Sequence, residues 1–115
     1  MSDLRLRRVE SFLGAEISRL ISSNTLKDPR VDSLVTVAGV RVAKDLTSAR
    51  IYVSYYGDQQ VLAATVAALN HASGFIQARI GRQLRMRHTP RLRFIADTSI
   101  MDGFRVTQQL KDVQR

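Results

Sequence analysis

A cluster of arginines in the second half of the chain has the clearest potential chemistry. The segment from Gln59 to Ala96 contains six arginines and no aspartate or glutamate, in a chain of 115 residues with a formal net charge of +8. These arginines are Arg79, Arg82, Arg85, Arg87, Arg91 and Arg93. A guanidinium group donates paired hydrogen bonds to phosphate that lysine cannot match. A solvated surface usually mixes both signs of charge, so this pattern favours a phosphate-binding surface.

Three further groups of cations are second-rank candidates for the same chemistry. One group begins the first predicted helix, one lies on or near a predicted hairpin, and one flanks a proline. In that order they are Arg5, Arg7 and Arg8; Arg41, Lys44 and Arg50; and Lys27 and Arg30. For the proline group, solvation of a loop explains the charges equally well. Tyr52 could stack on a base, but packing is the better explanation, so recognition of backbone and shape is expected.

Residues suited to catalysis or metal binding do not come together in this sequence. There is no cysteine, and no carboxylate lies close to His71 or His88, so the spacing of a metal site is missing. Ser73, His88 and Asp97 can be written as a triad, but no nucleophile-elbow motif surrounds the serine. We therefore expect no enzymatic activity, no metal and no cofactor.

Composition favours one domain with a polyanionic partner. Apolar residues make up 44% of the chain, which suits a packed core, and the positive charge favours nucleic acid over a membrane. No apolar run approaches the roughly 20 residues that cross a bilayer. The lack of cysteine is compatible with a reducing compartment, so a cytoplasmic location is expected.

Apolar spacing predicts the elements that position these cations. A helix is predicted from about Leu4 to Ser22, with Asn24 at its end, followed by a loop at residues 27–30. Strands are predicted over Leu34–Val42 and Ala49–Tyr55. Their short polar connector predicts an antiparallel hairpin.

Two helices joined by a kink are predicted next. The second helix runs from about Gln60 to His71, and Ser73 is expected to cap a third helix while Gly74 relieves the steric crowding of the joint. Exposed amides at such a helix start favour an anion, although a purely structural joint is equally plausible. Helical spacing places two sets of side chains on opposite faces: Ile76, Ile80 and Leu84, against Arg79, Arg82 and Arg85.

The last predicted element is a strand from Arg91 to Ala96, in which Arg91, Arg93 and Ile95 alternate with Leu92, Phe94 and Ala96. The order helix, strand, strand, helix, helix, strand predicts a single α+β domain of two layers. We place this domain at residues 1–104 and a tail, with weak helical character, at residues 105–115. The same order occurs in type II KH domains, whose paired helices are joined by a GxxG loop that holds nucleic-acid backbone. Here the joint has a single glycine.

Several short motifs follow one another in a specific order and spacing. They include Lys27-Asp28-Pro29-Arg30, Thr36-Val37, Asp45-Leu46, Tyr52-Val53 and Ala72-Ser73-Gly74-Phe75-Ile76. The series continues with Pro90, Leu92, Phe94, Asp97, Ser99, Gly103 and Arg105. Together these motifs resemble the ribosome-binding factor A family of small-subunit assembly factors. The family's Ala-x-Gly kink replaces the GxxG loop. Arg91 departs from the pattern, because an acidic residue is common at that place in the family.

The resemblance implies a non-enzymatic, KH-like protein that binds the small ribosomal subunit and its ribosomal RNA. It implies action during late maturation and rRNA processing, interplay with assembly GTPases, and a link to cold adaptation. A monomer is expected. One alternative stays open from the residues alone, a general DNA- or RNA-binding module that uses the basic helix pair. A nuclease is the competing enzymatic hypothesis, which the residues do not favour.

Overall fold

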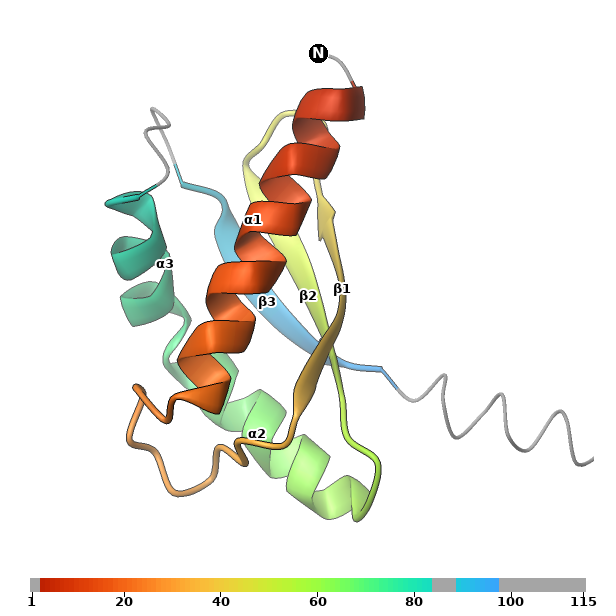
Figure 1. Ribbon diagram of the computed structural model, residues 1–115, viewed down its shortest axis with the longest axis vertical. Helices are drawn as coiled ribbons and strands as arrows, with labels where there is room; N and C mark the ends of the chain where they lie inside the picture. The colour runs from red at the N-terminus through yellow and green to blue at the C-terminus, as the bar shows by residue number, and fades with distance from the viewer. Residues whose placement is uncertain (1–2, 84–88, 98–115) are drawn as a thin grey trace, which may run out of the picture.

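The computed structural model describes residues 3–83 and 89–97, and these form an α+β arrangement of two layers (Figure 1). The elements are α1 (Asp3–Ser22), β1 (Thr36–Val42), β2 (Ser48–Ser54), α2 (Gln59–His71), α3 (Ser73–Gly81) and β3 (Arg91–Ala96). The order predicted from sequence, that of a type II KH domain, is confirmed. The predicted boundary at residue 104 and the tail at residues 105–115 lie outside the described residues.

Helix α1 forms because its apolar residues recur on one face. Leu13, Ile17 and Ile21 are almost fully buried along that stripe. The helix ends where Asn24 adopts the left-handed conformation, with φ of 56°. The amide of Asn24 donates to the Ile21 carbonyl at 3.2 Å and that of Thr25 to the Leu20 carbonyl at 3.3 Å. These two bonds satisfy carbonyls that the helix end would leave free, as Asn24 was predicted to allow.

The three strands form one sheet in the order β1-β2-β3. Strands β1 and β2 pair antiparallel, as the hairpin prediction required, with an irregularity between Val37 and Gly39. Strand β3 pairs parallel with β2, so the α2–α3 segment is the crossover between them. The predicted start of β1 at Leu34 is wrong, because the Asp32 carboxylate accepts a hydrogen bond from the Leu34 amide at 2.8 Å and forms a turn.

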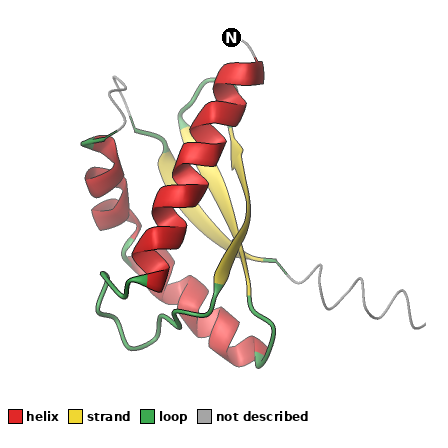
Figure 2. Cartoon of the chain, in the orientation of Figure 1, coloured by secondary structure: helices red, strands yellow, loops and turns green. Residues whose placement is uncertain are grey.

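The core lies between one face of the sheet and the three helices (Figure 2). Ile51 and Phe94 are buried on that face, packed in one cluster with apolar side chains of all three helices. The alternating residues of the sheet are exposed on the opposite face. Within the described residues no single helix has the length and hydropathy of a membrane span; α2 and α3 reach them only as a pair bent by 59°.

Candidate nucleic-acid interface

The joint between α2 and α3 is a sharp bend at a single residue. The two helices are bent by 59° relative to each other, and Ala72 lies between them with φ of −91° and ψ of 6°. Its amide donates to the Ala68 carbonyl at 3.0 Å, and its own carbonyl accepts from the Ile76 amide at 3.0 Å. Ala72 therefore closes one helix and opens the next. The prediction that Ser73 caps α3 is wrong, because Ser73 is already its first residue and the cap has no side-chain hydrogen bond.

Gly74 is not required by the geometry of the bend. No glycine among the described residues has a positive φ, and a Cβ placed on Gly74 would meet no atom within 4 Å. The expectation that Gly74 relieves steric crowding is therefore wrong. A glycine in a helix is less favourable than alanine by up to about 1 kcal/mol. The absent side chain instead leaves the backbone at this point of α3 open to close approach from outside.

Two amide side chains fasten the helix pair to the outer edge of β3 and to the segment just before it. The Asn70 side chain accepts from the Phe94 amide at 2.8 Å and donates to the Phe94 carbonyl at 2.9 Å. The Gln77 side chain donates to the Thr89 carbonyl at 3.0 Å. Asn70 thus satisfies both backbone groups that Phe94 would otherwise leave unpaired at the sheet edge. Sequence analysis missed both residues, because their partners are backbone groups that leave no trace in the pattern of side chains.

Helix α3 separates an apolar face from a basic one. Ile76 and Ile80 are buried, whereas Arg79 and Arg82 are exposed. Leu84, Arg85, Arg87 and His88 lie outside the described residues. The helix ends at Gly81, where a Cβ would come within 2.5 Å of the Thr89 hydroxyl oxygen. Phe75, which follows Gly74, exposes 54% of its surface and was not among the predicted site residues.

Two further arginines of the Gln59–Ala96 segment, which has no acidic residue, lie in the sheet layer. Arg91 and Arg93 are exposed on β3, while Leu92 and Phe94 between and beyond them are buried. The pairing of the strands sets Arg41 opposite Arg50, and Arg50 opposite Arg93. The guanidinium carbon of Arg50 lies 5.9 Å from the centre of the Tyr52 ring. Cations from three separate parts of the sequence therefore form one row across the sheet.

A basic hollow adjoins one end of this row. It has a volume of about 310 Å³ and lies between the first turns of α1 and the β1–β2 hairpin. Four cations line it, Arg7, Arg41, Lys44 and Arg50, together with Leu6, Glu10 and Val42. One oxygen of the Glu10 carboxylate accepts from the Val42 amide at 2.9 Å, which fastens α1 to the edge of β1. Arg8 is exposed on α1 but does not line the hollow.

Lys27 and Arg30 lie away from the other cations. Their loop is beside α2, at the end of the molecule opposite the turn that joins β1 and β2 (Figure 1). Arg30 binds the Asp28 carboxylate through Nε at 3.2 Å and Nη2 at 3.0 Å. Hydrogen bonds from Arg30 hold the pKa of Asp28 below its usual range. The structure therefore gives Arg30 a role within its own loop, which the Thr65 hydroxyl ties to α2 by a 3.0 Å bond to the Arg30 carbonyl.

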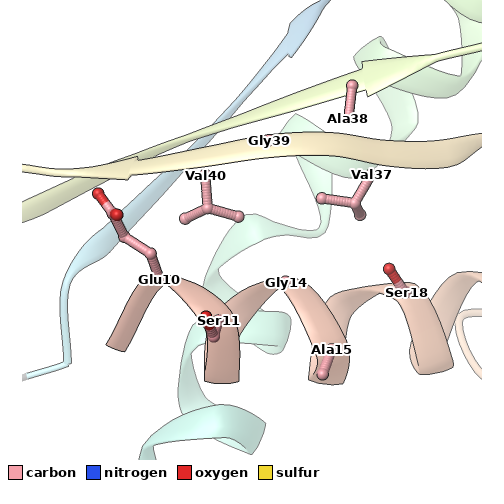
Figure 3. A pocket seen from close by; sticks show the side chains of 9 residues that line it. All are labelled: Glu10, Ser11, Gly14, Ala15, Ser18, Val37, Ala38, Gly39 and Val40. Atoms are coloured by element: carbon pink, nitrogen blue, oxygen red, sulfur yellow. The ribbon is translucent and has the colours of Figure 1, made fainter. Parts of the chain in front are cut away.

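A second hollow, of about 420 Å³, lies between α1 and β1 (Figure 3). Its walls are mostly small or apolar side chains, such as Gly14 and Ala15 of α1 and Val37 and Val40 of β1, and Glu10 also lines it. Gly14 faces Val40 across this hollow, and a Cβ on Gly14 would lie in ordinary contact with a Val40 methyl group, at 3.5 Å. No cation lines the hollow, so it does not extend the basic surface. Among the described residues, no group of three His, Asp or Glu side chains is placed to hold a metal.

Comparison with known proteins identifies the relatives of this chain. Residues 5–110 match the family model for ribosome-binding factor A. A ribosome-binding factor A from Desulfitobacterium hafniense is 43% identical over 115 residues, covering 100% of this chain and 90% of the relative. One from Anaeromyxobacter dehalogenans is 41% identical over 110 residues, covering 96% of this chain and 79% of the relative.

One crystal structure and one fitted homology model, both from Thermus thermophilus, are also similar. The crystal structure of its ribosome-binding factor A has a TM-score of 0.68 and 31% identity, covering 79% of this chain and 93% of that one. The second is a homology model of that factor, fitted into a cryo-EM map of its complex with 30S. Its TM-score is 0.56 with 31% identity, covering 76% of this chain and 93% of that one.

Proposed function

The chain belongs to the ribosome-binding factor A family, and we propose that it binds the small ribosomal subunit and contacts its ribosomal RNA. In this proposal it acts during late maturation and rRNA processing and catalyses no reaction. The family resemblance further supports action as a cytoplasmic monomer, interplay with assembly GTPases and a part in cold adaptation. The fit of a related factor into a map of a 30S complex supports the choice of partner.

The observation that carries this proposal is the exposed basic face of α3 beside an open backbone. Arg79 and Arg82 are exposed, and nothing occupies the space where Gly74 lacks a side chain. The first turn of α3 presents backbone amides, which favour a phosphate at the same place. RNA backbone can therefore approach the kink closely while Arg79, near the end of the same helix, and Arg82, directly after it, neutralise neighbouring phosphates. Arg85 and Arg87 are proposed to add to this face from the adjoining segment.

Rigid attachment of the helix pair makes this face a preformed site. Asn70 and Gln77 hold α2 and α3 to the backbone of β3 and its approach, so the bend keeps one angle. Phe75 offers an exposed ring beside Gly74 for packing against a base or ribose. With one exposed aromatic ring at the kink and no acidic residue on α3, the site suits backbone and shape more than base sequence.

The proposal is tested by sedimentation with free small subunits, free large subunits and whole ribosomes. At about 200 mM salt, where unspecific complexes dissociate, we expect selective cosedimentation with free small subunits. Arg82→Gln should weaken binding. It should also lower the slope of log affinity against log salt concentration by roughly 0.7 to 0.9, the contribution of one phosphate contact. The matched control is Arg19→Gln on α1, because Arg19 is an exposed cation paired with Glu16. Equal binding to all three particles would instead indicate an unspecific polycation.

A further inference from the structure

We infer that the outer face of the sheet is a second phosphate-binding surface, which holds an RNA segment separate from the one at α3. The inference rests on the proposed function, because it assumes an RNA partner. Its core is the row Arg41, Arg50 and Arg93, defined by the strand pairing. This surface faces away from the helix layer that carries Arg79 and Arg82.

The register makes the row a compact block of positive charge. Arg41 lies opposite Arg50 on the antiparallel side, and Arg93 lies opposite Arg50 on the parallel side. Neighbouring strands are about 4.8 Å apart, so the backbones that carry the three arginines lie within roughly 10 Å across the sheet. Arg91 adds a fourth exposed cation one row along, opposite Ser48. Flexible arginines at this spacing can contact successive phosphates of one strand.

The fold itself does not account for this row. Like charges directly opposite each other destabilise a sheet. Within residues 3–83 and 89–97, none of the three arginines forms an ion pair, whereas Arg19 pairs with Glu16 and Arg30 with Asp28. The Tyr52 ring near Arg50 makes only a weak cation–π contact and does not neutralise the charge of the arginine. A bound polyanion would remove the repulsion, and this complementarity favours RNA as the occupant.

The basic hollow extends the surface around the end of the sheet. Arg41 and Arg50 belong both to the row and to the hollow, where Arg7 and Lys44 join them. Glu10 is the one carboxylate in its lining, and one of its oxygens is engaged by the Val42 amide. Four cations against one carboxylate leave the hollow strongly positive. A phosphate seated there would continue the strand held by the row.

The consequence is a protein with RNA-binding surfaces on both of its layers. The α3 surface and the sheet surface are separated by the buried core, in which Ile76, Ile80, Ile51 and Phe94 pack. One RNA strand cannot pass through that core, so each surface holds its own segment. The protein would then fix the distance between two segments of ribosomal RNA, which a single basic face cannot do.

The test compares the triple variant Arg41→Thr, Arg50→Thr and Arg93→Thr with wild type. Threonine suits a strand and removes the repulsion, so the thermal midpoint should not fall. Affinity for protein-free small-subunit RNA and for purified free small subunits is measured between 50 and 200 mM salt. Losing three contacts should lower the slope of log affinity against log salt by about two. Between 50 and 200 mM salt, the variant's affinity should therefore fall by a factor roughly 16 times smaller than that of wild type. Arg19→Gln should leave the slope unchanged.

The outcomes separate the inference from the proposed function. An unchanged slope with protein-free RNA overturns the inference, even if the variant loses subunit binding; the face would then dock an acidic protein surface. If the wild type does not select small subunits, the proposed function fails, while the RNA slope still decides the role of this face. Adding Arg79→Gln and Arg82→Gln to the triple variant should give additive changes in slope. A combined effect no larger than that of the triple variant contradicts separate segments.

Discussion

Gly74 is the residue at which folding and the proposed RNA contact place different demands. Its φ is not positive and its missing Cβ would meet nothing, so the fold alone would accept alanine. Gly81, seven residues later, differs because a Cβ there would lie 2.5 Å from the Thr89 hydroxyl oxygen. The fold therefore requires glycine at position 81 but not at position 74, and alanine substitution at each position can distinguish the two cases.

We expect Gly74→Ala to stabilise the protein by about 0.5 to 1 kcal/mol, because alanine favours the helix and has free space. The same variant should bind small subunits more weakly, since the methyl group occupies the space proposed for RNA backbone. Gly81→Ala is the matched comparison and should destabilise by about 1 kcal/mol or more through its clash with Thr89. Chemical denaturation and cosedimentation measure the two quantities. Unchanged binding by Gly74→Ala would mean that RNA does not approach this backbone closely.

At the scale of elements, most boundaries followed from the sequence because they depend on burial. The stripe of Leu13, Ile17 and Ile21 predicted α1, and alternation in β2 and β3 predicted both strands. The start of β1 was wrong, since a turn at Asp32 takes over the Leu34 amide. Ser73 was predicted to cap α3, but Ala72 is the cap residue, and it forms the bend with backbone hydrogen bonds alone. Side-chain patterns carry little information on such backbone choices.

Asn70 is the element-scale contact with the largest expected effect on stability. Asn70→Ala would remove both hydrogen bonds to Phe94 and leave an amide and a carbonyl unpaired at the β3 edge. We expect a loss of about 2 to 3 kcal/mol of unfolding free energy. Amide exchange at Phe94 should become much faster than in wild type. Gln60→Ala, at an exposed position of the same helix, should change neither quantity.

Retention of Phe94 protection in Asn70→Ala would show that another group covers this edge. In the expected case, loss of the tether also loosens the angle between α2 and α3. Binding to small subunits should then weaken although no arginine has changed. That result would connect the positioning of the kink to recognition, separately from charge.

At the scale of the whole molecule, the acid-free segment was predicted as one basic surface and is divided between two layers. Arg79 lies on α3 and Arg82 directly follows it, whereas Arg91 and Arg93 lie on the exposed face of the sheet. Alternation in β3 predicted that its arginines face away from the core, but the meeting of Arg93 with Arg50 and Arg41 depends on strand order and register. The spacing of residues along the chain does not predict that β3 pairs parallel with β2. The grouping of charges thus required the tertiary structure.

A chain with a net charge of +8 binds many polyanions, so selectivity must come from where its charges lie. At 50 mM salt we expect binding to small subunits, large subunits and duplex DNA alike. Towards 200 mM salt the unspecific complexes should dissociate first, because they depend almost entirely on released counterions. The small-subunit complex should persist, since two surfaces at a fixed separation match only one arrangement of RNA. Competition of labelled small-subunit complex with duplex DNA measures this; displacement by an equal mass of DNA at 200 mM salt would show that shape contributes nothing.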